Sequence, residues 1–533
     1  MRRRSFLGGA IGAATLPGCQ PAHAIEGGFT GIDMARGHAL RDGRMDSGTP
    51  QVTRRTRVLV AGGGVAGLAA ARALRLQGID DFALLELEDA AGGNARSGAV
   101  DGIACPLGAH YLPLPGDAAS EVQDLLEELG LRRRVAGRWQ YDEFALCHSP
   151  QERLFFRGEW QDGLLPLHGV GESTLAQYRR FARRIEALRR ETRFVIPTLK
   201  APLSSTLLAL DAQPFASWLG REGFDDEHLL WLLDYCCRDD YGAGIAHVSA
   251  WAGLHYFASR HGFFAPGEDN GERDAVLTWP EGNGWLTRQL AAPLGERLHT
   301  GQVVTRIAQT RAGVELDAFD ARSQQMLRWQ AERCIVALPL FIALRVVENP
   351  PAWLRQAAAE LTYAPWLVAN VRIDAPLKDR PGAAPSWDNV LYGTRGLGYV
   401  DARHQSLDPT PRATVLSWYR PLGPSRYDAA SAAAGRQQLA AQPWRAWRDA
   451  LLAELSVAHP DLAERATRID ITRYGHAMAI PSPGRLAQLQ AGQPGGRTVP
   501  REGRLSFAHA DWAGYSIFEE AFTRGHIAGA NLA

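Results

Sequence analysis

The clearest hydrophobic pattern in the chain lies in its N-terminal fifth. A β-branched and aliphatic run, Val58–Ala61, predicts a buried strand. The alanine- and leucine-rich segment that follows predicts a helix that stops at Gly78. A second apolar run, Phe82–Leu85, predicts another buried strand, which ends in Glu86. Strand, helix and strand in this order predict a parallel α/β unit.

The rest of the chain changes from a helical to a strand-like pattern. Apolar residues recur at helical spacing over 122–129 and 175–188, and helical character continues from residue 234 to residue 256. Later runs predict the strands of a sheet, with a helix around 440–455 lying on them: 366–373, 390–400, 413–418 and 469–474.

A glycine-rich turn, Gly62-Gly63-Gly64-Val65-Ala66-Gly67, joins the first strand to the helix. Gly62 permits the tight turn, Gly64 lets backbone approach a pyrophosphate, and Gly67 lets the helix pack close to the strand. The start of the helix, at Val65 and Ala66, offers unpaired N–H groups to the phosphates. Glu86, about 20 residues further on, is placed to bind a ribose hydroxyl. The pattern therefore predicts a dinucleotide-binding site.

The residues after Glu86 indicate which dinucleotide binds. The segment from Glu86 to Gly92-Gly93-Asn94 resembles the Glu-x-x-x-x-x-Gly-Gly-Arg continuation of the FAD-dependent amine oxidase superfamily, which includes protoporphyrinogen oxidases and carotenoid desaturases. The glycine pair implies further backbone donors for the FAD phosphates and the flavin edge. Asn94 stands where the family has arginine, and Arg96 follows two residues later. FAD is implied by this resemblance alone, because the glycine fingerprint also serves NAD.

Further segments match the same superfamily. Gly108-Ala109-His110-Tyr111 is similar to the segment that runs beside the flavin ring, and Trp279–Leu286 is similar to the Pro-x-Gly-Gly return to the FAD domain. Val304 matches the valine whose backbone holds adenine, and Cys334–Pro339 resembles a buried strand ending in an Ala-x-Pro turn.

The C-terminus resembles the superfamily's last flavin segment. This resemblance implies that Asp511 binds the ribityl or pyrophosphate region. It also implies that the N–H groups of Ser516 and Ile517, at the start of a helix, face the pyrimidine carbonyl of the flavin, where negative charge develops on reduction.

The resemblance implies an α/β fold with two domains. One is a discontinuous, Rossmann-like FAD-binding domain of the GR2 type, and the other is an α+β substrate-binding domain with a mixed sheet and helices. The expected order is a signal segment (1–24), a tether or surface-hugging linker (25–55), a first FAD-binding segment (56–139), a helical substrate-domain segment (140–278), a second FAD-binding segment (279–340), a substrate-domain segment of sheet and helix (341–500) and a last FAD-binding segment (501–533).

Composition limits the chemistry. Formal net charge is zero, so no nucleic-acid or anionic-membrane partner is expected. The six cysteines show neither metal-ligand nor CxxC spacing, so no metal site is expected, and vicinal Cys236 and Cys237 favour helix packing over a disulfide. Lys200 and Lys378 are the only lysines. Family amine oxidases hold a water at flavin N5 with a lysine on the strand that is Trp366–Val371 here, and this strand has none.

The resemblance also suggests residues at the flavin face. Tyr474 and Trp512 are candidates for the aromatic cage of an amine oxidase, with core packing as the alternative for Tyr474. His476 or His110 is a candidate proton-transfer base, and a hydrogen-bonded structural histidine is the alternative. Two acidic positions could bind an ammonium group, but Asp239-Asp240 fits a helix-end pair better, and Asp388 fits a turn equally well.

The first residues predict export. Arg2-Arg3-Arg4-Ser5-Phe6-Leu7 resembles a twin-arginine signal, followed by a mild apolar run to Leu16 that is too short to span a membrane. Leu16-Pro17-Gly18-Cys19 resembles a lipobox that would lipidate Cys19. Ala22-His23-Ala24 is a competing signal-peptidase site, and both remain open. The expected location is periplasmic, with a membrane anchor if Cys19 is lipidated.

The leading hypothesis is an exported FAD oxidoreductase that oxidises the C–N bond of an amine, polyamine-like or simpler, by hydride transfer to flavin N5. The alternative is C–C desaturation or protoporphyrinogen oxidation on an apolar substrate, which the missing lysine also allows. A third is a flavin-bound protein without turnover. The sequence leaves open the substrate, the oligomeric state, the mode of FAD attachment, and whether oxygen, a quinone or a protein accepts the electrons.

Overall fold

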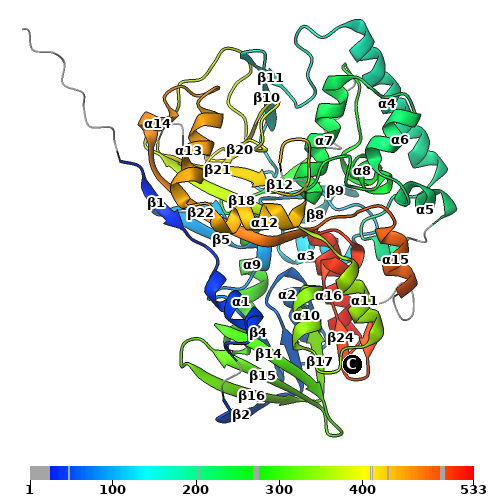
Figure 1. The fold of residues 1–533 in the computed structure, drawn as a ribbon, viewed down its shortest axis with the longest axis vertical. Helices are drawn as coiled ribbons and strands as arrows, with labels where there is room; N and C mark the ends of the chain where they lie inside the picture. Colours follow the sequence, from blue (N-terminus) through cyan, green and yellow to red (C-terminus); the bar gives the residue numbers. More distant parts are fainter. Residues whose placement is uncertain are drawn as a thin grey trace, which may run out of the picture.

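The computed structural model describes residues 24–45, 48–201, 204–267, 275–408, 410, 412–428, 431–492 and 499–532. The predicted export segment, including Cys19, lies outside the described residues. The described chain forms a FAD-type lobe and a larger lobe built on a second sheet, stacked along the long axis in Figure 1.

A parallel sheet forms the centre of the first lobe. Its central strand β3 is buried at every position, because helices cover one face and a second sheet covers the other. All pairings are parallel except that of the edge strand β23. The strand order is β13 (Leu298–Thr300), β4 (Phe82–Glu86), β3 (Val58–Ala61), β17 (Arg333–Val336), β24 (Leu505–Phe507) and β23 (Arg501–Glu502).

The two layers on this sheet come from distant regions of the chain. Helices α2 (Val65–Leu76), α3 (Ser120–Glu128), α9 (Gly284–Ala291) and α16 (Phe518–Ala530) pack on one face. A four-stranded sheet and two helices cover the other: β14 (Gln302–Gln309), β15 (Val314–Asp320), β16 (Gln325–Ala331), β2 (Val52–Arg55), α10 (Leu340–Val346) and α11 (Ala352–Glu360).

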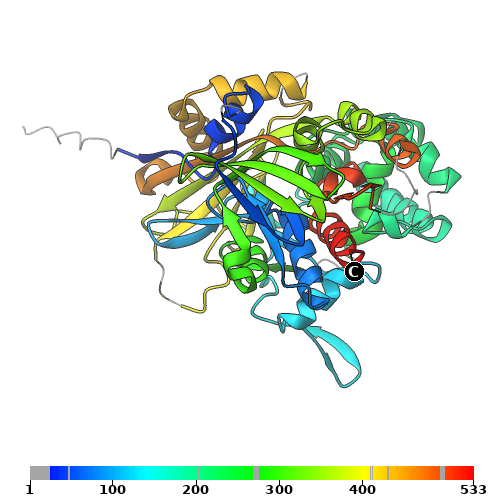
Figure 2. The ribbon, with the colours of Figure 1, turned by 90° about the horizontal axis from the view of Figure 1, so that it is seen from below.

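An eight-stranded mixed sheet forms the centre of the second lobe. Figure 2 shows α4 to α8 gathered at one side of the molecule, α12 and α13 at the other, and the hairpin β8–β9 projecting from the body. The strand order is β1 (Glu26–Phe29), β22 (Ala466–Ala479), β18 (Tyr363–Ile373), β21 (Thr414–Pro421), β20 (Tyr399–Asp401), β19 (Asp388–Leu391), β10 (Glu152–Phe156) and β11 (Glu159–Asp162).

Helices cover both faces of this sheet or extend from it. The remaining elements are α1 (Met34–Arg41), α4 (Glu172–Glu191), α5 (Ser205–Asp211), α6 (Phe215–Arg221), α7 (Glu227–Tyr241), α8 (Ala250–Tyr256), α12 (Ala432–Ala441), α13 (Trp444–Leu455), α14 (Leu462–Arg465), α15 (Arg485–Gly492), and the paired short strands β5 (Ser97–Val100) with β6 (Ile103–Pro106), β7 (Tyr111–Pro113) with β12 (Val276–Thr278), and β8 (Arg132–Val135) with β9 (Arg138–Tyr141).

The structure confirms the predicted α/β fold class and changes two local predictions. The run 390–400 is not one strand but two, β19 and β20, separated by a turn in which Gly393 and Gly398 adopt positive φ. The stretch 25–51 is more than a linker, because it contains β1 and α1. Its glycines and polar residues give no apolar period, and β1 forms only by pairing with β22, far away in sequence.

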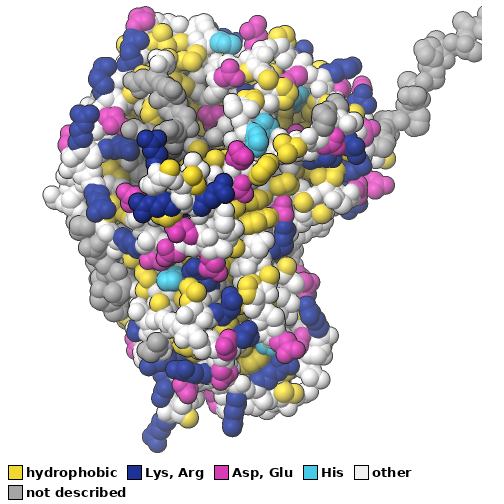
Figure 3. All heavy atoms as spheres, turned by 180° about the vertical axis from the view of Figure 1, so that it is seen from behind, with side chains coloured by type: hydrophobic (Ala, Val, Ile, Leu, Met, Phe, Trp, Pro, Cys, Tyr) yellow, Lys and Arg dark blue, Asp and Glu magenta, His cyan; other side chains and the backbone are white. Residues whose placement is uncertain are grey.

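Charged side chains of both signs share the surface, and the five cysteines of the described residues are free thiols. Positive and negative side chains are interspersed on the face shown in Figure 3. Cys236 and Cys237 lie buried on α7 as free thiols. Within the described ranges, the helices are all too short or too polar to cross a membrane.

Helices α2 and α16 pack unusually closely because glycines remove side chains between them. A Cβ atom at Gly525 would lie 2.0 Å from the carbonyl oxygen of Ala66, and one at Gly529 would lie 2.5 Å from that of Ala70. The matched spacing of these two contacts shows that the helices run in parallel, so both begin at the same end of the sheet.

We expect Gly525→Ala to lower stability by about 1–3 kcal/mol, because the added methyl group must push two backbones apart. The matched control is Gly220→Ala on α6, where an added Cβ meets no atom within 4 Å. That change should stabilise by up to about 1 kcal/mol through helix propensity. Thermal unfolding of the two variants measures the difference; equal melting temperatures would contradict the packing argument.

Candidate active site

One cavity of about 480 Å³ lies between the two lobes. The glycine turn, β4, the loop after β17 and the start of α16 form its wall in the first lobe. Strands β18, β21 and β22 and the end of α7 form its wall in the second. Of the residues predicted to bind the cofactor, Gly67 alone does not line this cavity. Those that do are Gly62, Gly64, Val65, Ala66, Glu86, Gly92, Gly93, Asn94, Gly108, Ala109, His110, Val304, Asp511, Ser516 and Ile517.

The glycine turn has the backbone geometry that its sequence requires. Gly62 has φ 103°, and a Cβ there would lie 2.4 Å from the carbonyl oxygen of Ala337. A Cβ at Gly67 would lie 1.8 Å from the carbonyl oxygen of Gly62, so Gly67 acts by letting α2 pack against the turn. No side chain caps α2 at Gly64. Its first N–H groups therefore remain available to an anion.

Glu86 ends β4 with its carboxylate against the cavity wall. The carboxylate accepts hydrogen bonds from the backbone N–H of Gly63 (2.8 Å) and of Glu88 (2.9 Å). Burial nevertheless raises its pKa, outweighing these two donors. Each carboxylate oxygen keeps a second acceptor position, which is what a ribose hydroxyl needs.

Asn94 stands where the family has arginine, and Arg96 follows two residues later; the two side chains make different contacts. The Asn94 side-chain amide donates to the carbonyl oxygen of Ala477 (2.7 Å), which ties the glycine-pair loop to β22. The Arg96 guanidinium is 7 % exposed, contacts the carbonyl oxygen of Gly93 (3.2 Å) and pairs with Glu88 (3.4 Å). Arg96, rather than residue 94, therefore brings a positive charge to the cavity.

The last segment presents a second helix N-terminus. Helix α16 begins at Phe518, and Ile517 provides no side-chain cap. The Ser516 hydroxyl accepts from the backbone N–H of Ala479, which fixes this loop on β22. The Asp511 carboxylate accepts from the N–H of Leu340 (2.9 Å) and the hydroxyl of Tyr363 (2.5 Å). Although burial raises its pKa, the neighbouring His509 and these donors lower it overall, so Asp511 is a buried anion that holds three segments together.

Three neighbouring strands of the large sheet supply an aromatic face. Trp366 on β18 pairs with Tyr474 on β22, and Val368 on β18 pairs with Tyr419 on β21. Directly paired residues face the same side of a sheet, and all four side chains line the cavity. The hydroxyls of Tyr474 and Tyr419 donate to the carbonyl oxygens of Leu107 (2.8 Å) and Gly108 (3.0 Å). Burial raises the pKa of Tyr474 to about 12, so it remains a neutral donor.

The two candidate histidines line the cavity as neutral rings. His110 packs against Tyr419 with ring centroids 4.4 Å apart, and burial lowers its pKa to about 3. His476 stacks on Phe341 at 4.5 Å, and burial lowers its pKa to about 4. Neither carries a proton charge near neutral pH.

Trp512 does not reach the cavity. Its ring lies in the hydrophobic core beneath the first sheet, 5.7 Å from the ring of Trp353. The sequence prediction placed it in the aromatic cage because it follows Asp511, but the 3-10 turn over 510–513 points it the other way. The structure places Tyr419 and Trp366 on the aromatic face instead. Trp366 begins the predicted strand 366–373, whereas Tyr419 lies one residue beyond the predicted strand 413–418, because β21 runs from Thr414 to Pro421.

Asp239 and Asp240 line the cavity at the last turn of α7. Two carboxylates at a helix C-terminus interact unfavourably with the helix dipole, so they do not stabilise α7. Burial raises the pKa of Asp239 to about 7, with a further contribution from the charge of Asp240, and burial raises the pKa of Asp240 to about 6. The structure places the pair at the helix end that the sequence prediction preferred, and it also places both residues in the cavity wall. Burial also raises the pKa of Asp388, and the charge of Asp239 adds to this increase.

Arg260 and Glu519 add a buried ion pair that the sequence did not reveal. Arg260 follows α8, and one guanidinium nitrogen contacts both Glu519 oxygens at 2.8 and 2.6 Å. Both residues line the cavity, and Glu519 is 2 % exposed. Burial lowers the pKa of Arg260, but Glu519 and Asp240 raise it more, so it stays charged. Glu519 neutralises this arginine, which leaves Asp239 and Asp240 as excess negative charge.

Neither lysine lies at the cavity. Lys200 binds Ser120 (2.9 Å) and Glu121 (2.5 Å) at the surface of the first lobe. Lys378 is exposed after the end of β18, where its backbone N–H contacts Asp461. The residues of β18 that line the cavity are Tyr363, Trp366 and Val368.

The model of the flavin-containing amine oxidoreductases matches residues 65–532. The chain belongs to this family. It is a FAD-dependent oxidoreductase, and its residues fit that cofactor: the uncapped N-terminus of α2 and Arg96 suit a diphosphate, the uncapped start of α16 suits the flavin carbonyl, and the Glu86 carboxylate suits a ribose.

Two curated relatives in the family match portions of the chain. An L-amino acid dehydrogenase of Synechocystis sp. is 26% identical over 39% of this chain and 41% of its own length. Polyamine oxidase 4 of Oryza sativa subsp. japonica is 27% identical over 57% of this chain and 56% of its own length. The alignments thus span about half the length of these relatives.

Solved structures share the fold. Putrescine oxidase bound to putrescine has a TM-score of 0.66 at 18% identity, over 90% of this chain and 99% of its own. Cyclohexylamine oxidase from Brevibacterium oxydans has a TM-score of 0.59 at 20% identity, over 89% and 98%. A CLA-producing fatty acid isomerase from P. acnes has a TM-score of 0.58 at 15% identity, over 88% and 97%.

We expect Glu86→Ala to weaken FAD binding about tenfold or more, because it removes a charged acceptor of a ribose hydroxyl. FAD retention after dialysis and the dissociation constant of re-added FAD measure this. Glu332→Ala, at an exposed site distant from the cavity, is the control. Retention equal to the wild type would contradict the ribose role.

Proposed function

We propose that this enzyme oxidises the C–N bond of a small, cationic amine. The observation that carries the proposal is that Asp239 and Asp240 line the same cavity as the aromatic face of Trp366, Tyr419 and Tyr474. Excess carboxylate charge attracts an ammonium ion, and aromatic faces bind cations and the adjoining methylene groups. The names of polyamine, putrescine and cyclohexylamine oxidases among similar proteins support the same substrate class.

The side chains have separable tasks. Asp239 and Asp240 bind the charged end of the amine, and their raised pKa values let them take a proton from an arriving ammonium group. The neutral rings of His110, Tyr419 and Tyr474 exclude water and orient the carbon that is oxidised. Bound FAD supplies the hydride acceptor. The amine becomes an imine, which takes up water to give a carbonyl compound and ammonia or a smaller amine.

The absence of lysine from the cavity bears on the electron acceptor. Because Lys200 and Lys378 both lie elsewhere, nothing in the described wall repeats the lysine-held water of oxygen-using family members. A dehydrogenase that passes electrons to a quinone or a protein fits this wall better than an oxidase.

The second candidate is C–C desaturation or a related conversion of an apolar substrate. The missing lysine permits it, and the similarity to a fatty acid isomerase shows that the same fold occurs in a protein named for such a substrate. Buried carboxylates at the cavity oppose it, because an apolar substrate would bring no positive charge to Asp239 and Asp240.

We expect anaerobic addition of putrescine, longer polyamines or a monoamine to bleach the flavin, and apolar polyenes to leave it unchanged. Asp239→Asn should weaken amine binding about tenfold or more, because it removes half of the carboxylate pair. Wild-type affinity should rise with pH between about 6 and 7 as the two carboxyls ionise, and the variant should lose the upper portion of this rise.

Visible spectroscopy of the mature holoprotein measures both effects, and Glu227→Gln, at the exposed first turn of α7, is the matched control. Bleaching by an apolar donor and by none of the amines would replace the first function by the second. A flavin that no donor reduces would exclude both.

We also propose that the protein leaves the cytoplasm folded and loaded with FAD through the twin-arginine route. The support is the sequence Arg2-Arg3-Arg4-Ser5-Phe6-Leu7 before a mild apolar run. Lipidation of Cys19 and cleavage after Ala24 remain the two alternatives for the mature N-terminus.

Changing Arg3 and Arg4 to lysine should retain the protein in the cytoplasm, because the twin-arginine pair is what the transport machinery reads. Cell fractionation measures the shift, and an Arg54→Lys, Arg55→Lys pair on exposed β2 is the control. Cys19→Ser, followed by mass spectrometry of the mature N-terminus, separates the two processing routes. Unchanged export of the double-lysine variant would exclude this route.

A further inference from the structure

The wall of the cofactor cavity includes residues that precede the glycine fingerprint. Ile32, Gly37 and Leu40 line the cavity, and they lie upstream of both the fingerprint and the matched residues 65–532. They belong to the segment 24–45, which comprises β1, a short turn and α1. We call this segment the N-terminal clasp. Leu40 is buried in the same hydrophobic cluster as Val304, the position that matches the family's adenine contact.

Each end of the clasp is attached to a different lobe. Strand β1 pairs in parallel with β22 from Glu26 to Phe29, so it extends the sheet that carries Tyr474. Thr30 continues the pairing with a hydrogen bond to the carbonyl oxygen of Ile471 (2.9 Å). Helix α1 lies on the first lobe, where its C-terminal carbonyl at Arg41 accepts from the Arg345 guanidinium (2.6 Å). The clasp therefore crosses the junction at which the cavity lies (Figure 1).

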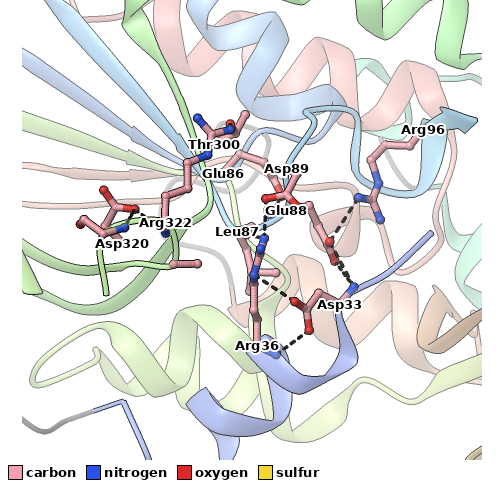
Figure 4. Close-up of polar contacts among 12 residues, drawn as sticks. Asp33, Arg36, Glu86, Leu87, Glu88, Asp89, Arg96, Thr300, Asp320 and Arg322 are labelled. Carbon is pink, nitrogen blue, oxygen red and sulfur yellow. Dashed lines mark hydrogen bonds and ion pairs between the residues drawn. The ribbon is translucent and has the colours of Figure 1, made fainter. Parts of the chain in front are cut away.

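The centre of the clasp binds the loop that follows Glu86. Figure 4 shows Arg36 reaching this loop from α1. The Arg36 guanidinium donates to the carbonyl oxygen of Leu87 (3.0 Å) and to the Asp89 carboxylate (2.9 Å). The backbone N–H of Asp33 contacts both Glu88 oxygens at 3.2 and 3.3 Å.

These contacts affect the position of Glu86, the residue predicted to bind the ribose. The Glu86 carboxylate is oriented by the N–H of Glu88, which lies between the two residues that Arg36 binds. The loop also concentrates the carboxylates of Glu86, Glu88 and Asp89 within four residues. Arg96 pairs with Glu88, and Arg36 provides the matching charge at Asp89. Without Arg36, repulsion among these three carboxylates would favour a different loop conformation, in which the Glu86 carboxylate no longer lies at the cavity wall.

We propose that the N-terminal clasp is a cofactor-binding element of this protein: it closes the ribose side of the FAD cavity, and Arg36 is the positioning residue that holds the Glu86–Asp89 loop. The clasp adds apolar contact through Ile32 and Leu40 and fixes the loop through Arg36. Bound FAD and the clasp therefore stabilise each other, because each completes the surface on which the other packs.

The first experiment compares two arginines of α1 in the full-length chain. Arg36→Ala should raise the dissociation constant of FAD about tenfold, since a partly buried arginine loses two charge-assisted or carbonyl contacts. Arg41→Ala is the matched control, because the Arg41 side chain makes an exposed pair with Asp42. Its FAD affinity should equal that of the wild type. The readout is the fluorescence of FAD released on dilution, which is independent of any substrate.

The second experiment uses the unaltered protein, so it holds even if Arg36→Ala fails to fold. Amide hydrogen exchange over residues 30–41 should be slower with FAD bound than after FAD is removed, whereas exchange in α13, which lies on the far side of the large sheet, should not change. Equal FAD affinities of the two arginine variants, or exchange in the clasp that is indifferent to FAD, would each overturn the proposal. Loss of amine oxidation alone would bear on the substrate and not on the clasp.

Discussion

The parallel packing of α2 against α16 is the constraint on which the rest of this structure depends. Two parallel helices in contact place like ends of their dipoles side by side, which is unfavourable by itself. The contact exists because Gly525 and Gly529 allow backbone to approach backbone, and because both helices bury an apolar face on the same sheet. Glu519 and Glu520 in the first turn of α16, together with an anion at the uncapped start of α2, offset the repulsion. The scaffold is thus most stable with a diphosphate in place.

This packing also explains the discontinuous domain. Helix α16 is the last element of the chain, and α2 is the first helix of the fingerprint, so the two ends of the domain must meet. Between α2 and α16, the chain leaves the first lobe twice to build the second lobe. It returns to the first lobe at β12–α9 and at β23–β24. Each departure and return occurs beside the parallel sheet. The cavity therefore forms where the segments of one lobe face β18, β21 and β22 of the other.

The sequence predicted those regions of the molecule whose geometry is local. Gly62, Gly64 and Gly67 indicate a tight turn, and their spacing to Glu86 indicates a strand–helix–strand unit whatever the rest of the chain does. The pairing of segments that are distant in sequence could not be predicted from such local patterns. Strand β1 lacks any apolar period and depends on β22, so its sequence alone predicts a linker over 25–51. The direction of Trp512 and the cavity position of Asp239 likewise depend on how a short turn and a helix end meet other elements. Arg260 and Glu519 carry no motif, and their pairing follows only from the packing of the segment after α8 against the first turn of α16.

The charges around the cavity divide it into two regions with opposite preferences. The N-terminus of α2 and Arg96 make one region attractive to phosphate, while Asp239 and Asp240 make the other attractive to an ammonium ion. The positive charge of Arg260 would weaken the attraction for an ammonium ion, but Arg260 forms an ion pair with the buried Glu519. One guanidinium nitrogen of Arg260 contacts both Glu519 oxygens, so an anionic substrate would meet an arginine whose charge Glu519 already offsets. A cation would favour the ionised form of the Asp239 and Asp240 carboxyls, whose pKa values burial has raised. The same buried pair therefore places a negative charge at the start of α16 and offsets the charge of Arg260 in the cavity.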